Sequence, residues 1–152
     1  MKILGIDAAT KTGWAFISRS GEIEESGVQD FAKRRGESNG MLFLKFRKWL
    51  SELITTCKPD LIVYERAHHR GGAATEICVN LSGRIQELAA ANGIEHSIVE
   101  TTSLKKWATG KGGAGKEQMI AAAEKFLGRP PIDDNEADAV LVALWGDKHY
   151  GF

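Results

Sequence analysis

Two apolar runs in this sequence each end in an acidic residue. Residues 3–6 lead into Asp7, and residues 61–64 lead into Glu65. Apolar runs of this length are typical of strands that are buried on both faces of a sheet. A buried carboxylate without a partner is costly or becomes protonated, so each acid needs a partner where its strand ends. We expect a hard metal ion shared at one edge of the sheet. The alternative is that each acid caps a loop or pairs with a nearby Lys or Arg.

A further group of acids lies near the C-terminus. Asp134 and Asp138 are four residues apart, so they lie on one face of a helix. Capping and dipole neutralisation could account for Asp133 and Asp134, but Asp138 lies one turn further in. Asp7, Glu65 and Asp138, with a fourth ligand from the first turn, could hold two metal ions about 4 Å apart for phosphodiester hydrolysis. Oxygen ligands favour Mg²⁺, with Mn²⁺ as a substitute, over zinc.

Two basic, glycine-containing loops accompany the acids. One covers residues 66–72 and directly follows Glu65. The other, Gly110 to Lys116, resembles a phosphate-binding Walker A loop, but Glu117 stands where that motif has Ser or Thr, and no strand is predicted before it. We therefore predict no nucleotide cofactor. A loop that positions phosphates, with Lys116 stabilising charge on the scissile group, explains the residues better, and a solvated loop between helices is the alternative.

A sheet flanked by helices is needed to bring these groups together. The apolar patterns predict three antiparallel strands, then a helix and a strand that returns parallel to the first strand. Strands are predicted over residues 3–7, 14–18, 22–31, 61–65 and 94–100. Helices are predicted over residues 41–57, 73–91, 101–107, 117–127 and 133–146, with Thr101 or Thr102 as the cap of the third. This order describes an α/β protein with a five-stranded mixed sheet, the ribonuclease H-like topology, as one domain over residues 1–152.

Composition limits the function classes. The chain has 152 residues, 43% of them apolar and 26% charged, as in ordinary globular domains. Its 20 basic and 20 acidic residues give no net charge, which weakens a nucleic-acid-binding role unless charge is segregated locally. Cys57 and Cys78 have no metal-ligand spacing and are expected to be reduced thiols. With no signal peptide and no run of about 20 apolar residues, we expect a soluble, cytoplasmic protein without membrane association.

Several short motifs, in their order and spacing, resemble the RuvC family of Holliday-junction resolvases over nearly the whole chain. The matching motifs are Gly5-Ile6-Asp7 with Gly13-Trp14-Ala15, Glu65 at the fourth strand's end, Lys105 and Lys116 eleven residues apart, and Ala137-Asp138-Ala139. The resemblance implies a homodimeric, Mg²⁺-dependent endonuclease that nicks two strands of a four-way DNA junction symmetrically. Helix 73–91 is our candidate for the dimer interface. The DNA-binding residues that we predict are Lys105, Lys111, Lys116, His68, His69 and Arg70.

The chain departs from the family at two positions. The family has Asp or His three residues before its last Asp, where this chain has Asn135, so either Asn135 or Asp134 is the fourth ligand. The family also has an aromatic wedge after its glutamate, at the position of His68; imidazole can stack on a base, and a solvated loop is the alternative. Other functions remain open: a related nuclease acting on RNA or other branched DNA, and a DNA-binding module that does not cleave. A sugar-kinase or actin-type ATPase would need a second domain that 152 residues do not supply.

Overall fold

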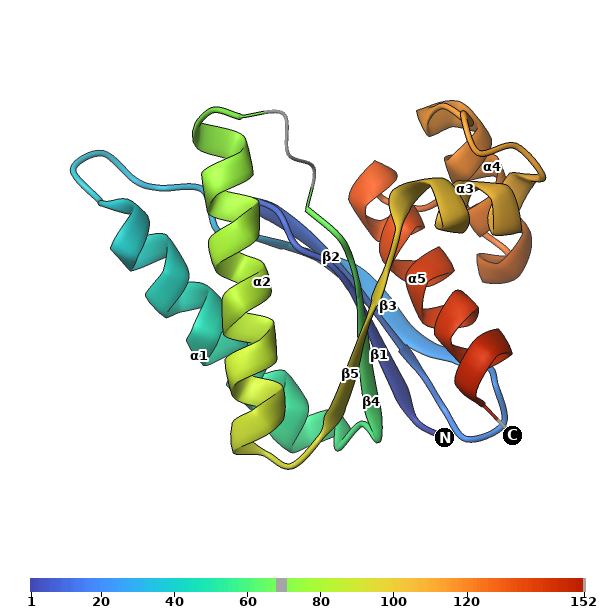
Figure 1. Ribbon diagram of the computed structural model, residues 1–152, viewed down its shortest axis with the longest axis horizontal. Coiled ribbons are helices and arrows are strands. Elements are labelled where there is room, and N and C mark those ends of the chain that lie inside the picture. The colour runs from blue at the N-terminus through green and yellow to red at the C-terminus, as the bar shows by residue number, and fades with distance from the viewer. Residues whose placement is uncertain (68–70, 152) are drawn as a thin grey trace.

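Five strands form one mixed sheet in the computed structural model, which describes residues 1–67 and 71–151 (Figure 1). The order across the sheet is β3-β2-β1-β4-β5. The first three strands form the predicted antiparallel meander, and β4 and β5 run parallel to β1. The strands are β1 (Ile3–Asp7), β2 (Lys11–Ile17), β3 (Ile23–Asp30), β4 (Leu61–Glu65) and β5 (Glu95–Val99).

The register between β1 and β4 brings the two strand-end acids together. Ile6 of β1 pairs with Tyr64 of β4, and both strands run in the same direction. Asp7 and Glu65 are the next residues along, so they emerge at the same edge of the sheet. The four residues that precede each acid are buried, as expected for central strands with a helix layer on each face.

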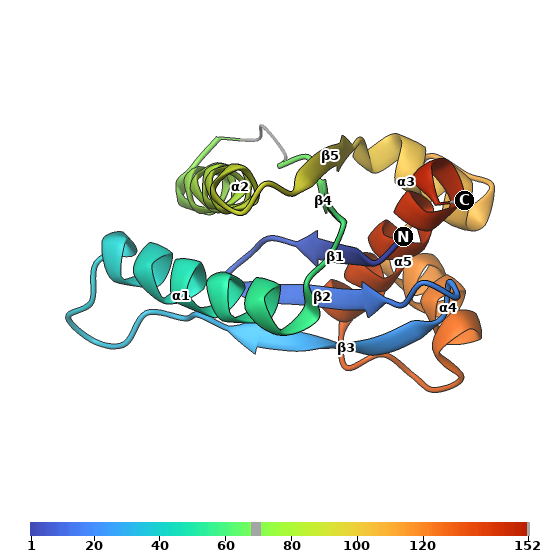
Figure 2. The same cartoon turned by 90° about the horizontal axis from the view of Figure 1, so that it is seen from below.

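The helices form one layer on each face of the sheet, as Figure 2 shows. Helices α1 (Asn39–Cys57) and α2 (Ala73–Ala91) cover one face. Helix α5 (Asp134–Tyr150) covers the other, with α3 (Thr101–Thr109) and α4 (Lys116–Leu127) packed beside it. Because side chains alternate along a strand, β1 and β4 contribute to both cores. Leu4, Ile6, Ile62 and Tyr64 pack under α1 and α2, whereas Ile3, Leu61 and Val63 pack under α5.

Several element boundaries differ from the prediction. Strand β2 begins at Lys11 and not at residue 14, α1 begins at Asn39 and not at residue 41, and α3 ends at Thr109 and not at residue 107. The last helix does not end near Gly146 but continues to Tyr150, because Gly146 lies inside it and allows close packing on β4. A Cβ at this glycine would come within 2.7 Å of a methyl group of Val63. Neither threonine caps α3: the cap residue is Glu100, without a side-chain hydrogen bond to the helix. Helix α4 begins at Lys116, so this lysine belongs to a helix terminus.

The helix lengths and the two cysteines can be compared with the predictions from composition. None of the described helices is long and apolar enough to cross a membrane. Cys57 and Cys78 are both free thiols, and each side chain is partly buried.

Candidate metal centre

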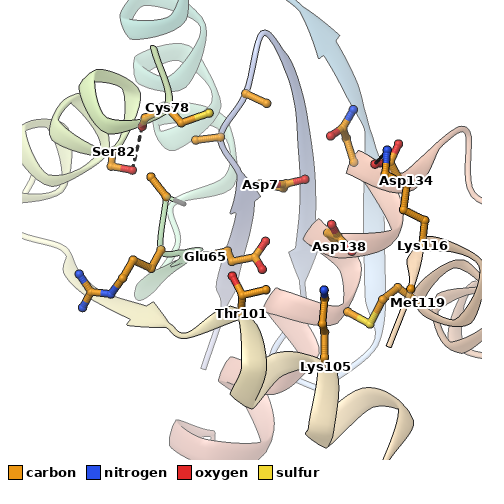
Figure 3. Close-up of a pocket in the computed structure, with 16 residues that line it drawn as sticks. Asp7, Glu65, Cys78, Ser82, Thr101, Lys105, Lys116, Met119, Asp134 and Asp138 are labelled. Atoms are coloured by element: carbon orange, nitrogen blue, oxygen red, sulfur yellow. Dashed lines mark hydrogen bonds and ion pairs between the residues drawn. The ribbon is translucent and has the colours of Figure 1, made fainter. Parts of the chain in front are cut away.

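Three carboxylates from three separate elements meet at the edge of the sheet. Asp7 ends β1, Glu65 ends β4, and Asp138 lies in the second turn of α5. Each offers one oxygen atom, and these atoms lie within 4.8 Å of one another. Figure 3 shows the three side chains directed toward a common point in a cavity of about 300 Å³.

Helix α5 lies unusually close to β1 and β2, and two glycines make this possible. A Cβ at Gly5 would lie 2.6 Å from the backbone nitrogen of Ala143 and 2.7 Å from the carbonyl oxygen of Ala139. A Cβ at Gly13 would overlap the backbone carbonyl of Asn135. Real Cβ atoms do not approach other atoms this closely, so the helix axis is pressed onto the strands only because both residues are glycine. This contact holds the first turns of α5 next to Asp7.

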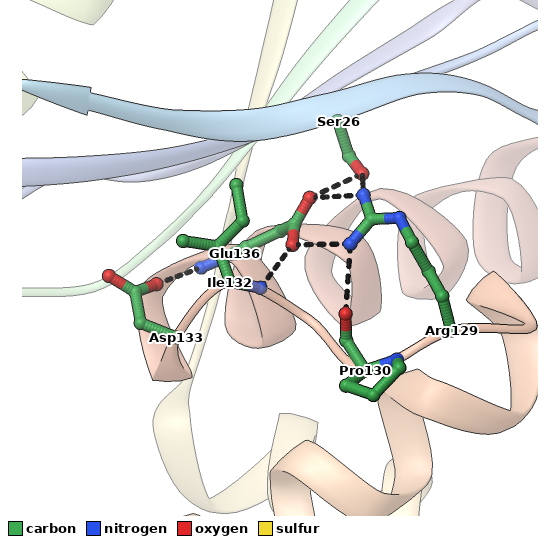
Figure 4. A network of polar contacts seen from close by, with 6 residues as sticks. All are labelled: Ser26, Arg129, Pro130, Ile132, Asp133 and Glu136. Atoms are coloured by element: carbon green, nitrogen blue, oxygen red, sulfur yellow. Dashed lines mark hydrogen bonds and ion pairs between the residues drawn. The ribbon is translucent and has the colours of Figure 1, made fainter.

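The first turn of α5 is fixed by its cap and by a buried carboxylate (Figure 4). Asp133 is the N-cap, and its carboxylate accepts a hydrogen bond of 2.9 Å from the backbone N–H of Glu136. The Glu136 carboxylate is fully buried and points toward Ser26 of β3. It accepts hydrogen bonds from both terminal nitrogens of Arg129, at 3.0 and 2.8 Å, from the N–H of Ile132 at 2.6 Å, and from the Ser26 hydroxyl at 2.8 Å.

This network ties the α4–α5 connection and β3 to the start of α5. Burial alone would raise the pKa of Glu136, but the hydrogen bonds from Arg129, Ile132 and Ser26 outweigh it and lower the pKa below its usual value. Glu136 is therefore ionised and structural, while its neighbours Asp134 and Asn135 line the cavity. The sequence reasoning did not single out Glu136, because nothing in the sequence places Arg129 and Ser26 beside it.

The electrostatics of the cavity favour a bound cation. Burial, followed by the charges of Asp138 and Glu65, raises the pKa of Asp7 well above its usual value. Burial, followed by Glu65 and Asp134, raises the pKa of Asp138 to about 7, although Lys105 and Lys116 act in the opposite direction. Carboxylates held this close repel one another when ionised, so a cation that binds between them displaces protons.

The donor set fits a hard divalent ion. All three converging groups are carboxylates, with no sulfur or imidazole donor among them. Oxygen donors of this kind suit Mg²⁺ and similar hard ions. Asp134 and Asn135 lie at the same cavity and offer a further carboxylate or amide oxygen.

Two lysines flank the acids from the α3 and α4 side. Lys105 projects from the middle of α3, and Lys116 is the first residue of α4. The ammonium group of Lys116 lies 3.5 Å from the Asp134 carboxylate, and its side chain is 80% exposed. An exposed ion pair of this length is weak, so Lys116 can turn toward a ligand at little cost.

Most of the predicted site residues come together at this cavity. The predicted residues that line it are Asp7, Glu65, Lys105, Lys116, Asp134, Asn135 and Asp138. Lys111 is exposed and is not among the lining residues. His68, His69 and Arg70 lie outside the described residues. The lining residues that sequence reasoning did not assign to the site are Ala8, Ala9, Arg66, Ala67, Cys78, Ser82, Thr101, Gly115 and Met119. Of these, Arg66, Ala67 and Gly115 carry a sequence signal, because they belong to the two basic loops that accompany the acids.

Fold and site together define the class of protein. The sheet order with its two helix layers is the ribonuclease H-like fold, and clustered carboxylates with flanking lysines suit metal-dependent phosphodiester hydrolysis. The RuvC family, described as crossover junction endodeoxyribonuclease RuvC, matches residues 3–145. The chain belongs to this family.

Relatives agree with this assignment, and solved structures share the fold. The crossover junction endodeoxyribonuclease RuvC of Prochlorococcus marinus is 28% identical, over 100% of this chain and 99% of the relative. That of Rhodopirellula baltica is 31% identical, over 97% of this chain and 85% of the relative. The Thermus thermophilus RuvC structure has a TM-score of 0.81 at 18% identity, covering 99% of this chain and 98% of that one. The T. thermophilus RuvC structure in complex with a Holliday junction substrate also has a TM-score of 0.81, at 19% identity, covering 95% and 91%.

Proposed function

We propose that this chain resolves four-way DNA junctions by metal-dependent hydrolysis of two symmetry-related phosphodiesters. The observation that carries the proposal is the convergence of Asp7, Glu65 and Asp138 in a cavity flanked by lysines, in a chain of the RuvC family. Three carboxylates at this spacing repel one another when ionised, and a bound cation relieves that repulsion.

The three carboxylates are proposed as metal ligands, with Asp134 or Asn135 as the fourth. Mg²⁺ is the ion that we propose, with Mn²⁺ as a substitute, because the donors are oxygen atoms. Bound ions of this kind activate the attacking water and stabilise the leaving oxygen in phosphodiester hydrolysis. The part of this chain is to hold the ligands rigidly: β1 and β4 fix two of them, and the glycine contacts of α5 fix the third.

The lysines are proposed to act on the DNA backbone. Lys116 sits at the mouth of the cavity on an exposed side chain, where it can stabilise charge that develops on the scissile phosphate. Lys105 is half-buried at the same cavity and can hold a neighbouring phosphate oxygen. Lys111 is proposed to contact phosphate further out. The roles of His68 and of the residues beside it stay predictions from the sequence.

A homodimer is proposed because symmetric nicking requires two active sites on one junction. Helix α2 supports this through an exposed apolar residue, Val79, whose surface is 44% exposed. Val79 lines a hollow of about 310 Å³ together with Gly83, Gln86 and Ile98. Light scattering should give twice the chain mass, and Val79→Asp should shift the protein toward monomer. A monomeric wild-type protein, with and without junction DNA, would contradict the dimer.

The experiment that tests the function is nicking of a labelled four-way junction in Mg²⁺, beside a linear duplex and RNA of the same sequence. We expect paired, symmetric nicks in the junction alone. Asp7→Asn, Glu65→Gln and Asp138→Asn should each abolish cleavage and leave junction binding nearly intact, because each removes a ligand charge and little DNA-contacting surface. Wild-type rates for Asp7→Asn would overturn the metal assignment, and equal cleavage of linear duplex would overturn the substrate.

A further inference from the structure

Three consecutive cations lie in the connection between β3 and α1. We call Lys33, Arg34 and Arg35 the basic segment; all three residues are exposed. The chain as a whole has 20 basic and 20 acidic residues, so a run of three cations is a local segregation of charge. The cavity-lining residues do not include any part of the basic segment.

Both sides of the basic segment are anchored to the body of the protein. On the N-terminal side, the Phe31 ring is 4% exposed and packs against Phe46 and Trp49, with ring centroids 5.4 and 5.5 Å apart. On the C-terminal side, Glu37 accepts a hydrogen bond of 2.7 Å from the backbone N–H of Arg34. These contacts hold the backbone of the segment, while its side chains extend into solvent.

The acids nearest to the basic segment are already engaged elsewhere. Glu37 forms an ion pair with Lys45 at 2.7 Å, and the Asp30 carboxylate accepts a hydrogen bond of 2.8 Å from the N–H of Ala32. Within the described part of the chain, none of the three cations has a carboxylate oxygen within 4.0 Å. The charge of Arg34 acts on Glu37, but no carboxylate among the described residues forms a direct ion pair with the segment. Exposed cations without a direct ion pair can bind phosphates with release of counterions.

The segment lies at the end of the sheet that holds the acids. Asp30, the last residue of β3, pairs with Lys11, which begins β2 four residues after Asp7. Figure 2 shows the β3–α1 connection extending beyond the strand ends on this side of the molecule. DNA bound at the acidic cavity therefore has this segment on the same side of the protein.

The chain geometry limits how far the segment lies from the site. Strand β3 is two strands away from β1, which is about 10 Å. The six residues from Val28, which pairs with Gly13 beside Asp7, to Arg34 span at most about 21 Å. Arg34, the middle residue of the basic segment, thus lies within about 25 Å of the end of β1, a length that corresponds to about seven base pairs at 3.4 Å each.

We propose that Lys33, Arg34 and Arg35 form a second phosphate-binding site, which contacts the backbone of a duplex arm within about seven base pairs of the cleaved phosphodiester. The proposal rests on the proposed junction-resolving function. Contacts of this kind are independent of sequence, and they position the arm without taking part in hydrolysis.

The test compares two triple variants that remove the same charge. The first is Lys33→Gln/Arg34→Gln/Arg35→Gln. The matched control is Arg19→Gln/Lys58→Gln/Lys148→Gln, three exposed cations at the opposite end of the sheet, after β2, before β4 and near the end of α5. Junction affinity is measured over a series of salt concentrations, and nicking is measured at saturating enzyme. Thermal unfolding confirms that both variants fold.

The first variant should bind the junction at least about tenfold more weakly at low salt, and the slope of log affinity against log salt should decrease by about 2 to 3. Its nicking rate at saturation should stay at the wild-type value, because the segment does not reach the reacting phosphate. The control variant should match the wild type in both. An unchanged slope, or an equal loss in the control, would overturn the proposal.

Neutral methylphosphonate linkages placed one at a time along an arm then locate the contact. The wild-type protein should lose affinity at linkages within about seven base pairs of the nick, and the first triple variant should lose none there. Identical profiles for the two proteins would overturn the proposed location. A wild-type protein that neither binds nor nicks junctions would overturn the proposed function instead, so the two failures are distinguishable.

Discussion

Gly13 of β2 lies directly against the backbone carbonyl of Asn135, the second residue of α5. The strand that returns from Asp7 therefore supports the helix turn that carries the fourth ligand candidates. Gly13 also pairs with Asp7 across the β1–β2 hairpin. This one glycine therefore contacts both β1, which carries Asp7, and α5, which carries Asn135. This contact couples the spacing of the acids to the packing of the sheet.

Gly13→Ala should therefore displace the first turn of α5. We expect a loss of about 1 to 3 kcal/mol in the free energy of unfolding, as for other overpacked sites, and a nicking rate that needs more Mg²⁺. Thermal unfolding and a Mg²⁺ titration of nicking measure both effects. Gly40→Ala in the first turn of α1 is the control, because its Cβ would meet only the Ser38 hydroxyl at 3.4 Å. Wild-type stability and Mg²⁺ dependence for Gly13→Ala would show that the contact is unimportant.

Glu136→Gln should destabilise the protein most at neutral pH. The hydrogen-bonded Glu136 has a lowered pKa, so its stabilising effect is present above the usual pKa of glutamate and is lost as pH falls through the lowered value. At neutral pH, the loss of charge-assisted bonds from Arg129 should cost about 2 kcal/mol, and the difference from the wild type should shrink as pH falls below the usual pKa of glutamate. Urea unfolding over a pH series measures this. The exposed Glu52→Gln is the control, and a difference that is independent of pH would contradict an ionised Glu136.

The central part of the fold was predictable because its signals are local. The boundaries of β4 and α2 agree with the prediction, since apolar patterns and turn residues mark both ends. The convergence of Asp7, Glu65 and Asp138 was also predicted, because parallel strands that end in acids bring them to one edge. Packing contacts between distant residues that leave no local pattern were not predictable.

Gly146 and Glu136 show why such contacts escape sequence reasoning. Gly146 looks like a helix end, yet Val63 packs on it, and no local signal shows that pairing. Glu136 looks like a helix-start acid, yet Ser26, 110 residues away in the sequence, helps to bury it. In both cases a residue that is distant in the sequence determines the local structure, which is the continuation of α5 past Gly146 and the burial of Glu136.

The metal-free protein should become less stable as pH rises. The pKa of Asp7 is raised and that of Asp138 is raised to about 7, so the stability that their neutral forms provide is complete below the usual carboxyl pKa. It is lost as pH rises through the folded-state values, from about pH 4 to about pH 7 and above. In chelator, the melting temperature should therefore fall by several degrees over this range, and excess Mg²⁺ should restore it at the upper end. Asp138→Asn should flatten the profile. A wild-type profile that matches this variant would contradict the coupled acids.

Lys116→Ala should reduce the nicking rate more than junction affinity. The exposed ammonium group is 3.5 Å from Asp134 and free to turn toward a phosphate. If it stabilises charge in the transition state, its loss should lower the rate at saturating enzyme by about 10²-fold. Single-turnover nicking at saturating and sub-saturating enzyme distinguishes rate from binding. Lys125→Ala, at an exposed lysine of α4 that does not line the cavity, is the control. If the Lys116→Ala variant nicks at the wild-type rate when the enzyme is saturating, Lys116 only binds phosphate and does not stabilise the transition state.

Asp134 and Asn135 are the two candidates for the fourth metal ligand. Both line the cavity, and Asp134 is close enough to raise the pKa of both Asp7 and Asp138. The amide nitrogen of Asn135 donates a hydrogen bond of 3.3 Å to Asp133, which engages part of its side chain with the helix cap. A carboxylate also binds a hard divalent ion better than an amide oxygen does. We therefore predict that Asp134 is the ligand.

Asp134→Asn should then raise the Mg²⁺ concentration that gives half-maximal nicking, by about tenfold if one charged ligand is lost. Asn135→Ala, which keeps every carboxylate, should leave that concentration nearly unchanged. Because Asp134 also pairs with Lys116, the Asp134→Asn titration is repeated in the Lys116→Ala background. If Asp134 is a metal ligand, the required Mg²⁺ concentration rises in this background too. If Asp134 acts only through the lysine, the concentration does not change. If Asn135→Asp accelerates nicking while Asp134→Asn has no effect, Asn135 holds the ligand position and the assignment is wrong.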